Sequence, residues 1–253
     1  MNILITGGIG FIGTYTAKAL KEHNITFYDE VDRDNILDFD QLLHKLKGID
    51  LVYHFASLKN VQESIEKPNY YHIKNVVGTS TLLEAMLHHN ITRIIFSSSA
   101  AVYDESDKAI KENSKLKPVT PYGENKRDIE TLLKDFDYTI LRYFNVVGDH
   151  PNANGLVQIA QNCLKEDKEI NVYGNSIRDY IHINDVVEAN IQALNWNKQT
   201  VNIGRGIEVS TMDIINKIGV KYKQCPELQE IKKSVADITK AKSLGWQFRY
   251  DII

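Results

Sequence analysis

Residues 2–13 read Asn-Ile-Leu-Ile-Thr-Gly-Gly-Ile-Gly-Phe-Ile-Gly, and they carry the strongest fold signal in the chain. An apolar run typical of a buried strand leads into Gly7, Gly10 and Gly13, and a helical pattern follows. The first glycine permits a tight turn, the second lets the backbone approach a pyrophosphate, and the third lets the helix pack closely on the strand. Because a strand and a helix flank the glycines, the stretch predicts a dinucleotide-binding loop.

The start of this helix and the end of the next strand complete the predicted loop. Phe11 and Ile12 stand at the helix N-terminus, where free N–H groups and a partial positive charge attract a diphosphate. The next predicted strand, Ile25–Tyr28, ends at Asp29, about 20 residues beyond the loop. A carboxylate there accepts hydrogen bonds from the adenine ribose hydroxyls and repels a 2′-phosphate, so it favours NAD over NADP.

The turn after this strand leaves two alternatives open. Asp29 could instead be a solvated turn residue, because Asp32 and Asp34 crowd the same turn. Arg33 lies between these two and has the charge needed to bind a 2′-phosphate, which weakens the preference for NAD.

Short apolar runs alternate with amphipathic helical stretches through the first half of the chain. We interpret as strands the runs Ile3–Ile5, Ile25–Tyr28, Leu51–Phe55, Ile94–Phe96 and Thr139–Arg142. Strands that alternate with helices imply right-handed crossovers and a parallel sheet. We therefore expect an α/β protein with a Rossmann-type doubly wound parallel sheet and a small C-terminal substrate-binding domain. The cofactor domain is expected over 1–150, with 177–205 returning to it, and the substrate domain over 151–176 and 206–253.

Composition excludes several classes of function. The chain has 253 residues and a formal net charge of −3, so it lacks the excess positive charge typical of proteins that bind nucleic acid or membrane surfaces. We find no apolar run of the roughly 18 residues that a membrane span needs. The two cysteines, Cys163 and Cys225, lack metal-ligand spacing, so we expect no metal site and a reduced, cytoplasmic protein.

Two further segments carry side chains suited to proton transfer. Residues 97–99 are serines that follow a predicted strand, and Tyr122 precedes Lys126 by four positions. A helix places the tyrosine and the lysine on one face, where the ammonium is expected to lower the tyrosine pKa toward working pH. A serine hydroxyl at the end of the strand can hydrogen-bond to the same substrate oxygen. Together they could move the proton of an alcohol while hydride leaves its carbon.

The order of these motifs behind a glycine loop resembles the extended short-chain dehydrogenase/reductase family, and within it the UDP-glucose 4-epimerases. A tyrosine four residues before a lysine is common by itself, but the matched series here extends over almost the whole chain. The further family-like segments are His54-Phe55-Ala56-Ser57-Leu58-Lys59, Glu63-Ser64, Asn75-Val76-Val77-Gly78-Thr79, Leu141-Arg142-Tyr143-Phe144-Asn145, Arg178-Asp179-Tyr180-Ile181-His182 and Ala236-Asp237-Ile238-Thr239-Lys240-Ala241.

The resemblance implies roles by position. It implies that Ser99 and Tyr122 act on the sugar's 4-hydroxyl. It implies that Lys126 binds the nicotinamide ribose and adjusts the pKa of Tyr122. Beyond the glycine loop, it implies cofactor contacts for Asp29, Asn35, Ile36, Phe55, Ala56, Lys59, Asn75, Ser97, Tyr122, Lys126 and Tyr143.

The resemblance also implies a substrate-binding set. Asn145 and Arg178 would bind the substrate diphosphate, and Ser99 and Tyr122 would contact the sugar. Without the family, Arg178 is better interpreted as a structural ion pair, Asn145 as a turn residue and Lys59 as a solvated surface group.

The implied activity is 4-epimerisation of a nucleotide-diphosphate hexose through a transient 4-keto sugar. UDP-glucose and UDP-galactose are the expected substrates, together with the N-acetylhexosamines. Hydride returns to the same sugar, so no net redox occurs and NAD can stay bound. The alternative is an NAD(P)-dependent nucleotide-4-keto-sugar reductase or a dehydrogenase of another small alcohol. Family members commonly form homodimers through two helices, expected here at Thr79–His88 and Asn125–Leu133.

The chain departs from the family pattern on the diphosphate and adenine sides. The link from Asp29 to the segment that begins at Asn35 is very short, so the adenine side of the pocket is expected to be trimmed. Glu227 stands about where the family places a diphosphate-binding arginine, and another cation would have to replace it: Arg205, Lys232 or Lys233.

Two departures concern the sugar. Ser234 stands at the position that gates the pocket in the family, and a small side chain there predicts room for an N-acetyl group. Ala100 and Ala101 occupy the turn where related dehydratases and decarboxylases carry acids, which favours epimerisation or reduction.

Overall fold

The computed structural model describes residues 1–226 and 231–253, so Glu227 lies outside the described residues. The chain divides into two compact units. The first comprises residues 1–104, 115–142 and 187–201, and the second comprises 105–114, 143–186 and 202–253. Among the described residues, no helix is both long enough and apolar enough to cross a membrane.

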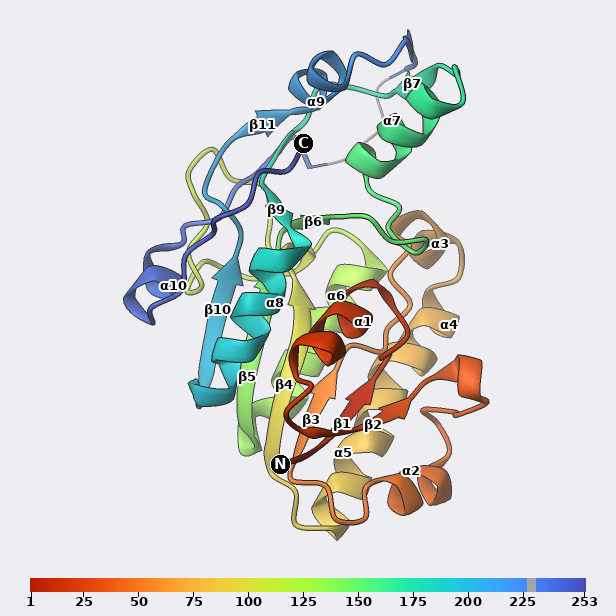
Figure 1. Ribbon diagram of the computed structural model, residues 1–253, viewed down its shortest axis with the longest axis vertical. Helices are drawn as coiled ribbons and strands as arrows, with labels where there is room; N and C mark the ends of the chain where they lie inside the picture. Colours follow the sequence, from red (N-terminus) through yellow and green to blue (C-terminus); the bar gives the residue numbers. More distant parts are fainter. Residues whose placement is uncertain (227–230) are drawn as a thin grey trace. The chain divides into compact units, whose positions relative to one another are not determined.

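A six-stranded sheet forms the largest sheet of the described chain, and it confirms the predicted fold class (Figure 1). Its strands are β1 (Asn2–Thr6), β2 (Asn24–Tyr28), β3 (Leu51–His54), β4 (Arg93–Ser99), β5 (Asp137–Tyr143) and β10 (Gln199–Ile203). They are ordered β10-β5-β4-β3-β1-β2, and β1 pairs in parallel with both β2 and β3. The winding reverses between β1 and β3, which is where doubly wound folds bind their ligands.

Helices cover both faces of this sheet. Their bounds in the first half are α1 (Phe11–Ala19), η1 (Glu30–Asp32), α2 (Phe39–Lys45), α3 (Val61–Glu66), α4 (Pro68–His72), the π-helix η2 (Ile73–Val77), α5 (Gly78–His88), η3 (Ala100–Val102), α6 (Pro121–Leu132) and η4 (Leu133–Asp135). Helices α8 (Ile183–Gln192) and η5 (Ala193–Asn195) follow later in the chain. The predicted strand–loop–helix start is therefore confirmed.

Alternating side chains of the strands separate the two helical layers. On one face, α2, α5 and α6 pack on a core that includes Val52 and Ile94. Burying each such aliphatic side chain contributes about 1.5–3 kcal/mol. On the other face, the Tyr53 hydroxyl donates to the Asn190 carbonyl of α8 at 2.7 Å, and Asn190 Nδ2 donates to Thr16 Oγ1 of α1 at 2.9 Å.

Sequence-local signals set where the helix that carries Tyr122 begins. Thr120 is the N-cap of α6, and its hydroxyl accepts the Gly123 N–H at 3.2 Å. Pro121 occupies the first helical position, where its missing N–H costs no intrahelical bond. These two residues place Tyr122 in the first turn.

The second unit is made of small sheets and short helices. Its elements are β6 (Asn145–Val147), α7 (Leu156–Lys165), β7 (Ile170–Val172), β8 (Ile177–Arg178), β9 (Tyr180–His182), β11 (Val209–Ser210), α9 (Thr211–Ile218), β12 (Tyr222–Gln224), β13 (Lys233–Ser234) and α10 (Thr239–Ser243). The described sheets are β11-β8-β13, β12-β7 and β6-β9.

Residues 105–114 also belong to the second unit, although they precede α6 in the chain. The Ile110 N–H donates to the Val235 carbonyl at 2.8 Å, and Asn202 Nδ2 donates to the Ile110 carbonyl at 2.8 Å. No sequence pattern indicated this placement.

Candidate active site

The glycine loop has the geometry that its sequence predicts. Gly7 has a φ of 69°, and a Cβ there would lie 2.6 Å from the Ala56 backbone nitrogen. A Cβ on Gly13 would lie 2.3 Å from the Gly7 carbonyl oxygen. Both positions therefore exclude side chains for steric reasons.

The first turn of α1 fits an anionic cofactor group. Gly10 is the N-cap, and because glycine has no side chain it caps none of the first-turn N–H groups. Phe11 and Ile12 are the first two residues of the helix. A bare helix N-terminus beside a crowded glycine turn suits the diphosphate of a dinucleotide.

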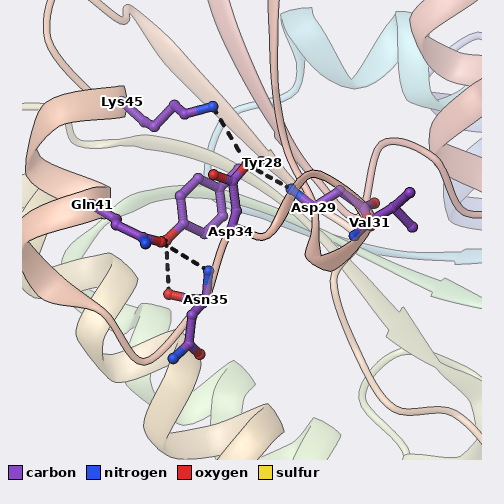
Figure 2. Close-up of polar contacts among 7 residues, drawn as sticks. All are labelled: Tyr28, Asp29, Val31, Asp34, Asn35, Gln41 and Lys45. Carbon is purple, nitrogen blue, oxygen red and sulfur yellow. Dashed lines mark hydrogen bonds and ion pairs between the residues drawn. The ribbon is translucent and has the colours of Figure 1, made fainter.

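The Asp29 carboxylate holds the backbone around the loop. Its Oδ2 accepts the Ile9 N–H at 3.0 Å. Its Oδ1 accepts the Val31 N–H at 3.3 Å, and Figure 2 draws Asp29 and Val31. A carboxylate has about four acceptor positions, so two such bonds leave capacity for ribose hydroxyls. Asp29 is thus both a structural residue of the turn and a residue suited to bind ribose.

The short link after Asp29 is closed by its own hydrogen bonds (Figure 2). Asp34 Oδ2 accepts the Asp29 N–H at 3.1 Å and pairs with Lys45 Nζ at 3.4 Å. The Tyr28 hydroxyl donates to the Asn35 carbonyl at 2.7 Å, so the predicted cofactor residue Asn35 is fixed through its backbone.

Ile36, the other predicted cofactor residue of this link, is buried. It packs against the start of α5, where a Cβ on Gly78 would lie 2.6 Å from Ile36 Cγ2. Glycine at this position therefore lets the trimmed link approach the helix closely.

The segment after β3 lies at the switch point of the sheet. The Phe55 N–H donates to the Thr6 carbonyl at 3.0 Å, and the Ala56 N–H donates to Thr6 Oγ1 at 3.3 Å. Asn75, on the π-helix η2, accepts the Leu58 N–H at 2.8 Å and donates to the Leu58 carbonyl at 3.0 Å. Asn75 therefore shapes this segment through its side chain. Lys59, the next residue of the segment, is exposed.

His54 is a hydrogen-bonded core residue. Its Nδ1 lies 2.6 Å from Thr6 Oγ1 and its Nε2 lies 2.8 Å from Thr79 Oγ1. Burial, with a smaller effect of Lys126, lowers the pKa of His54 to about 3, so the ring is neutral.

The structure brings together the residues predicted for proton transfer. A hydrogen bond joins Tyr122, in the first turn of α6, to Ser99 at the end of β4. Lys126 Nζ donates to the Ser97 carbonyl at 2.7 Å and lies 5.8 Å from the centroid of the Tyr122 ring. Lys126 is 2% exposed, and it also stands over the Phe96 ring at 4.8 Å.

The pKa predicted for Tyr122 is wrong in direction. Burial raises the pKa of Tyr122 to about 12, and the hydrogen bond from Ser99 offsets only part of this rise. The reason is that burial penalises the phenolate, while the neighbouring ammonium is itself destabilised. Burial lowers the pKa of Lys126 to about 7, and Glu130 opposes this decrease.

The predicted substrate residues belong to the second unit. Asn145 Nδ2 donates to the Asp179 carbonyl at 2.9 Å, and Arg178 Nη1 donates to the Ile177 carbonyl at 3.1 Å. Ser234 on β13 is buried and pairs in register with Arg178 on β8. Tyr143, a predicted cofactor residue, is also buried in this unit.

Asp179 organises this unit, although the sequence analysis did not single it out. Its carboxylate accepts the N–H groups of Arg205 and Gly206, each at 2.8 Å, and of Ala236 at 3.2 Å. A Cβ on Gly204 would lie 2.6 Å from its Oδ2. Burial raises the pKa of Asp179 to about 6 despite these hydrogen bonds. Its position between an arginine and a tyrosine of the family-like segment was the available signal.

Comparison with known proteins identifies the family. The sequence profile of the NAD dependent epimerase/dehydratase family matches residues 3–204. The chain belongs to this family. Its members use NAD, so NAD is the cofactor of this enzyme, and the predicted resemblance is confirmed. The UDP-glucose 4-epimerase of Yersinia enterocolitica is 36% identical over an alignment of 273 residue positions. The alignment covers 86% of this chain and 81% of that protein.

Solved structures agree with this assignment. The UDP-glucose-4-epimerase of Stenotrophomonas maltophila, solved with NAD and formylated UDP-arabinopyranose, is 29% identical with a TM-score of 0.91 over 100% of this chain and 94% of that chain. The UDP-N-acetylglucosamine 4-epimerase of Methanobrevibacter ruminantium, solved with UDP-N-acetylmuramic acid, is 28% identical with a TM-score of 0.90 over 99% of this chain and 93% of that chain.

Proposed function

We propose that this enzyme interconverts UDP-hexoses by inverting carbon 4 through a transient 4-keto sugar. The observation that carries the proposal is the hydrogen-bonded Ser99–Tyr122 pair with Lys126 one helical turn away. The names of the relatives, UDP-glucose 4-epimerase and UDP-N-acetylglucosamine 4-epimerase, support the same reaction class.

The reaction divides between the cofactor and the side chains. When bound, NAD would supply the hydride transfer from carbon 4 of the sugar and back to it. Tyr122 takes the proton of the 4-hydroxyl and later gives it back, while Ser99 holds the same oxygen. Lys126 stabilises the phenolate of Tyr122 when its ammonium is charged. The high Tyr122 pKa makes this positive charge necessary.

The remaining predicted residues take binding roles. Within the first unit, the glycine loop, Asp29 and the segment from Phe55 to Lys59 hold NAD. Within the second unit, Asn145 and Arg178 bind the substrate diphosphate. The small Ser234 leaves room for an N-acetyl group, so simple and N-acetylated hexoses are both expected as substrates.

We infer that the enzyme is a homodimer. Several apolar side chains are exposed on helices of the first unit that pack against one another: Tyr70 on α4, Ile73 and Val77 on η2, and Leu132 on α6. An exposed apolar patch of this kind marks an interaction surface. Sedimentation at micromolar concentration tests this inference, and a monomer would contradict it.

The decisive experiment is incubation with UDP-galactose or UDP-glucose without added cofactor. Interconversion, with near-stoichiometric NAD released on denaturation, is the expected result. Absence of turnover with all UDP-hexoses and UDP-N-acetylhexosamines would overturn the proposal. Turnover only with added NAD(P)H and a keto sugar would indicate the reductase alternative.

A further inference from the structure

A buried ion pair in the first unit is hydrogen-bonded to the strand that carries Ser99. Arg142 on β5 donates from Nε to Glu130 Oε1 at 2.9 Å and from Nη2 to Glu130 Oε2 at 2.6 Å. The two side chains are 6% and 7% exposed. Such a pair is weak evidence for stability, because two well-packed apolar residues are often as stable or more so. Its presence therefore calls for another explanation.

The pair is connected to the serine-bearing strand end. Ser98 Oγ donates to Glu130 Oε1 at 2.5 Å, one residue after Ser97 accepts from Lys126. Glu130 follows Lys126 by four residues on α6, so two side chains one turn apart fasten two consecutive residues of β4 to this helix. Ser99 is the next residue of the same strand.

Arg142 extends the network past Ser99. Its Nη1 donates to the Tyr103 hydroxyl at 2.6 Å, and its guanidinium stands over the Tyr103 ring at 4.8 Å. Tyr103 directly follows the turn η3 that begins after Ser99. The residues on both sides of Ser99 are thus tied to the same buried pair.

Glu130 is the charge that acts on Lys126. Without NAD and substrate, His54 on β3 is neutral and burial raises the pKa of Tyr122 to about 12, so neither side chain adds a charge beside Lys126. Arg142 is paired with the Glu130 carboxylate at 2.6 Å. Burial lowers the pKa of Lys126, and the Glu130 carboxylate opposes this.

The remaining ionisable groups on the helices packed against α6 have other environments. Glu63 on α3 pairs with Lys67 at 3.0 Å and accepts the Tyr71 hydroxyl. Lys74 on η2 pairs with Glu30 at 2.9 Å. Glu66 on α3 and His72 on α4 are exposed to solvent.

We propose that Glu130, held by Arg142, is a positioning residue that places a negative charge one helical turn from Lys126 and fixes the Ser97–Ser99 strand end against α6. The identity of Lys126 as the group that stabilises the Tyr122 phenolate rests on the proposed function. The electrostatic effect of Glu130 on Lys126 does not depend on the proposed function, so this inference and the proposed function can be tested separately.

The first test follows the Lys126 ammonium directly. Protein labelled with ¹³C at lysine Cε is titrated by NMR, and the Lys126 signal is assigned by its loss in Lys126→Met. In Glu130→Gln, and in Glu130→Gln/Arg142→Gln, Lys126 is expected to lose its proton at lower pH than in the wild type. The double variant removes both charges while its amides can still bond to Ser98 and Tyr103, so it keeps the test valid if the single variant fails to fold. The same titration midpoint as in the wild type would overturn the proposal.

The second test is the pH profile of epimerisation. For the double variant we expect turnover to fall roughly tenfold at the alkaline end of the profile and by no more than about threefold at the acidic end. This is the result expected when the pKa of the lysine is lowered by about 1. A uniform loss at every pH would indicate only a structural role. Glu124→Gln, an exposed carboxylate on the same helix, is the matched control and should keep the wild-type profile. An inactive wild type with a shifted Lys126 titration would refute the proposed function while leaving this inference intact.

Discussion

Lys126 in the first unit and Asp179 in the second are both buried groups whose pKa values burial moves toward neutrality. They differ in what surrounds them. Lys126 is next to a tyrosine and a serine that can exchange protons with a substrate, and its direct hydrogen bond goes to a single carbonyl. The Asp179 carboxylate instead accepts hydrogen bonds from three backbone N–H groups.

The difference shows that a displaced pKa does not by itself identify a catalytic group. Buried ion and hydrogen-bond networks displace pKa values as well. The neighbours of a buried ionisable group distinguish a structural role from a catalytic one. A group that is hydrogen-bonded to several backbone N–H groups supports the fold, whereas a group beside other titratable side chains can take part in chemistry. The following experiments test this distinction.

The largest effect is expected at the chemical centre. Tyr122→Phe should lower turnover by roughly a hundredfold or more, because it removes the group that accepts the proton. Folding and NAD content should be unchanged, since the substitution keeps the ring and removes one hydroxyl, which is hydrogen-bonded to Ser99. Steady-state kinetics and the NAD released on denaturation check both points. Near-normal turnover would refute the role of Tyr122.

Substitution of Asp179 should lower the stability of the protein more directly than its activity. Asp179→Ala leaves the buried Ala236 N–H and the part-buried N–H groups of Arg205 and Gly206 without their acceptor. The buried group alone costs about 1–3 kcal/mol, so a loss of at least about 1 kcal/mol in unfolding free energy is expected. Urea unfolding of the purified variant measures it. A stable variant with lost activity would show that Asp179 takes part in the chemistry and not only in folding.

The pKa of Asp179 also predicts a pH dependence of stability. Its folded pKa of about 6 is above the ordinary value of 3.8, so the folded state binds more protons than the unfolded state between these values. Stability should therefore fall as pH rises from about 4 to about 6, by on the order of 2 kcal/mol. In Asp179→Asn this fall should be absent. Urea unfolding at several pH values compares the two proteins, and parallel curves would show that Asp179 has an ordinary pKa.

The smallest expected change has the opposite sign. Lys126→Met removes a buried ammonium whose pKa burial lowers, so this variant should unfold roughly 2–4 °C above the wild type near pH 7 while losing turnover. Thermal unfolding of both proteins without ligand gives the answer. A lower midpoint for the variant would mean that the hydrogen bond to Ser97 outweighs the cost of burying the charge.

The sequence predicted the parts of the site that depend on local spacing. Gly7 and Gly13 lie where the glycine pattern places a turn, and Tyr122 and Lys126 share a helix face because they are four residues apart. Arg142 could not be connected to Glu130 from sequence, because β5 and α6 meet only in the folded sheet. The four-residue step from Lys126 to Glu130 was nevertheless available as a signal. The sign of the Tyr122 pKa shift was missed for a related reason, since it depends on burial.

The sheet order has a consequence for how the protein can be handled and extended. β2 is the last strand in the order, so Asn24–Tyr28 presents one row of backbone N–H and C=O groups at the edge. An edge of this kind can accept an added strand, and it can also promote aggregation. Its short length of five residues limits that risk, although Phe27 is exposed beside the glycine loop. Peptide extensions or crystallisation tags should therefore be kept away from this edge, where added β-structure would compete for the strand that orients Asp29.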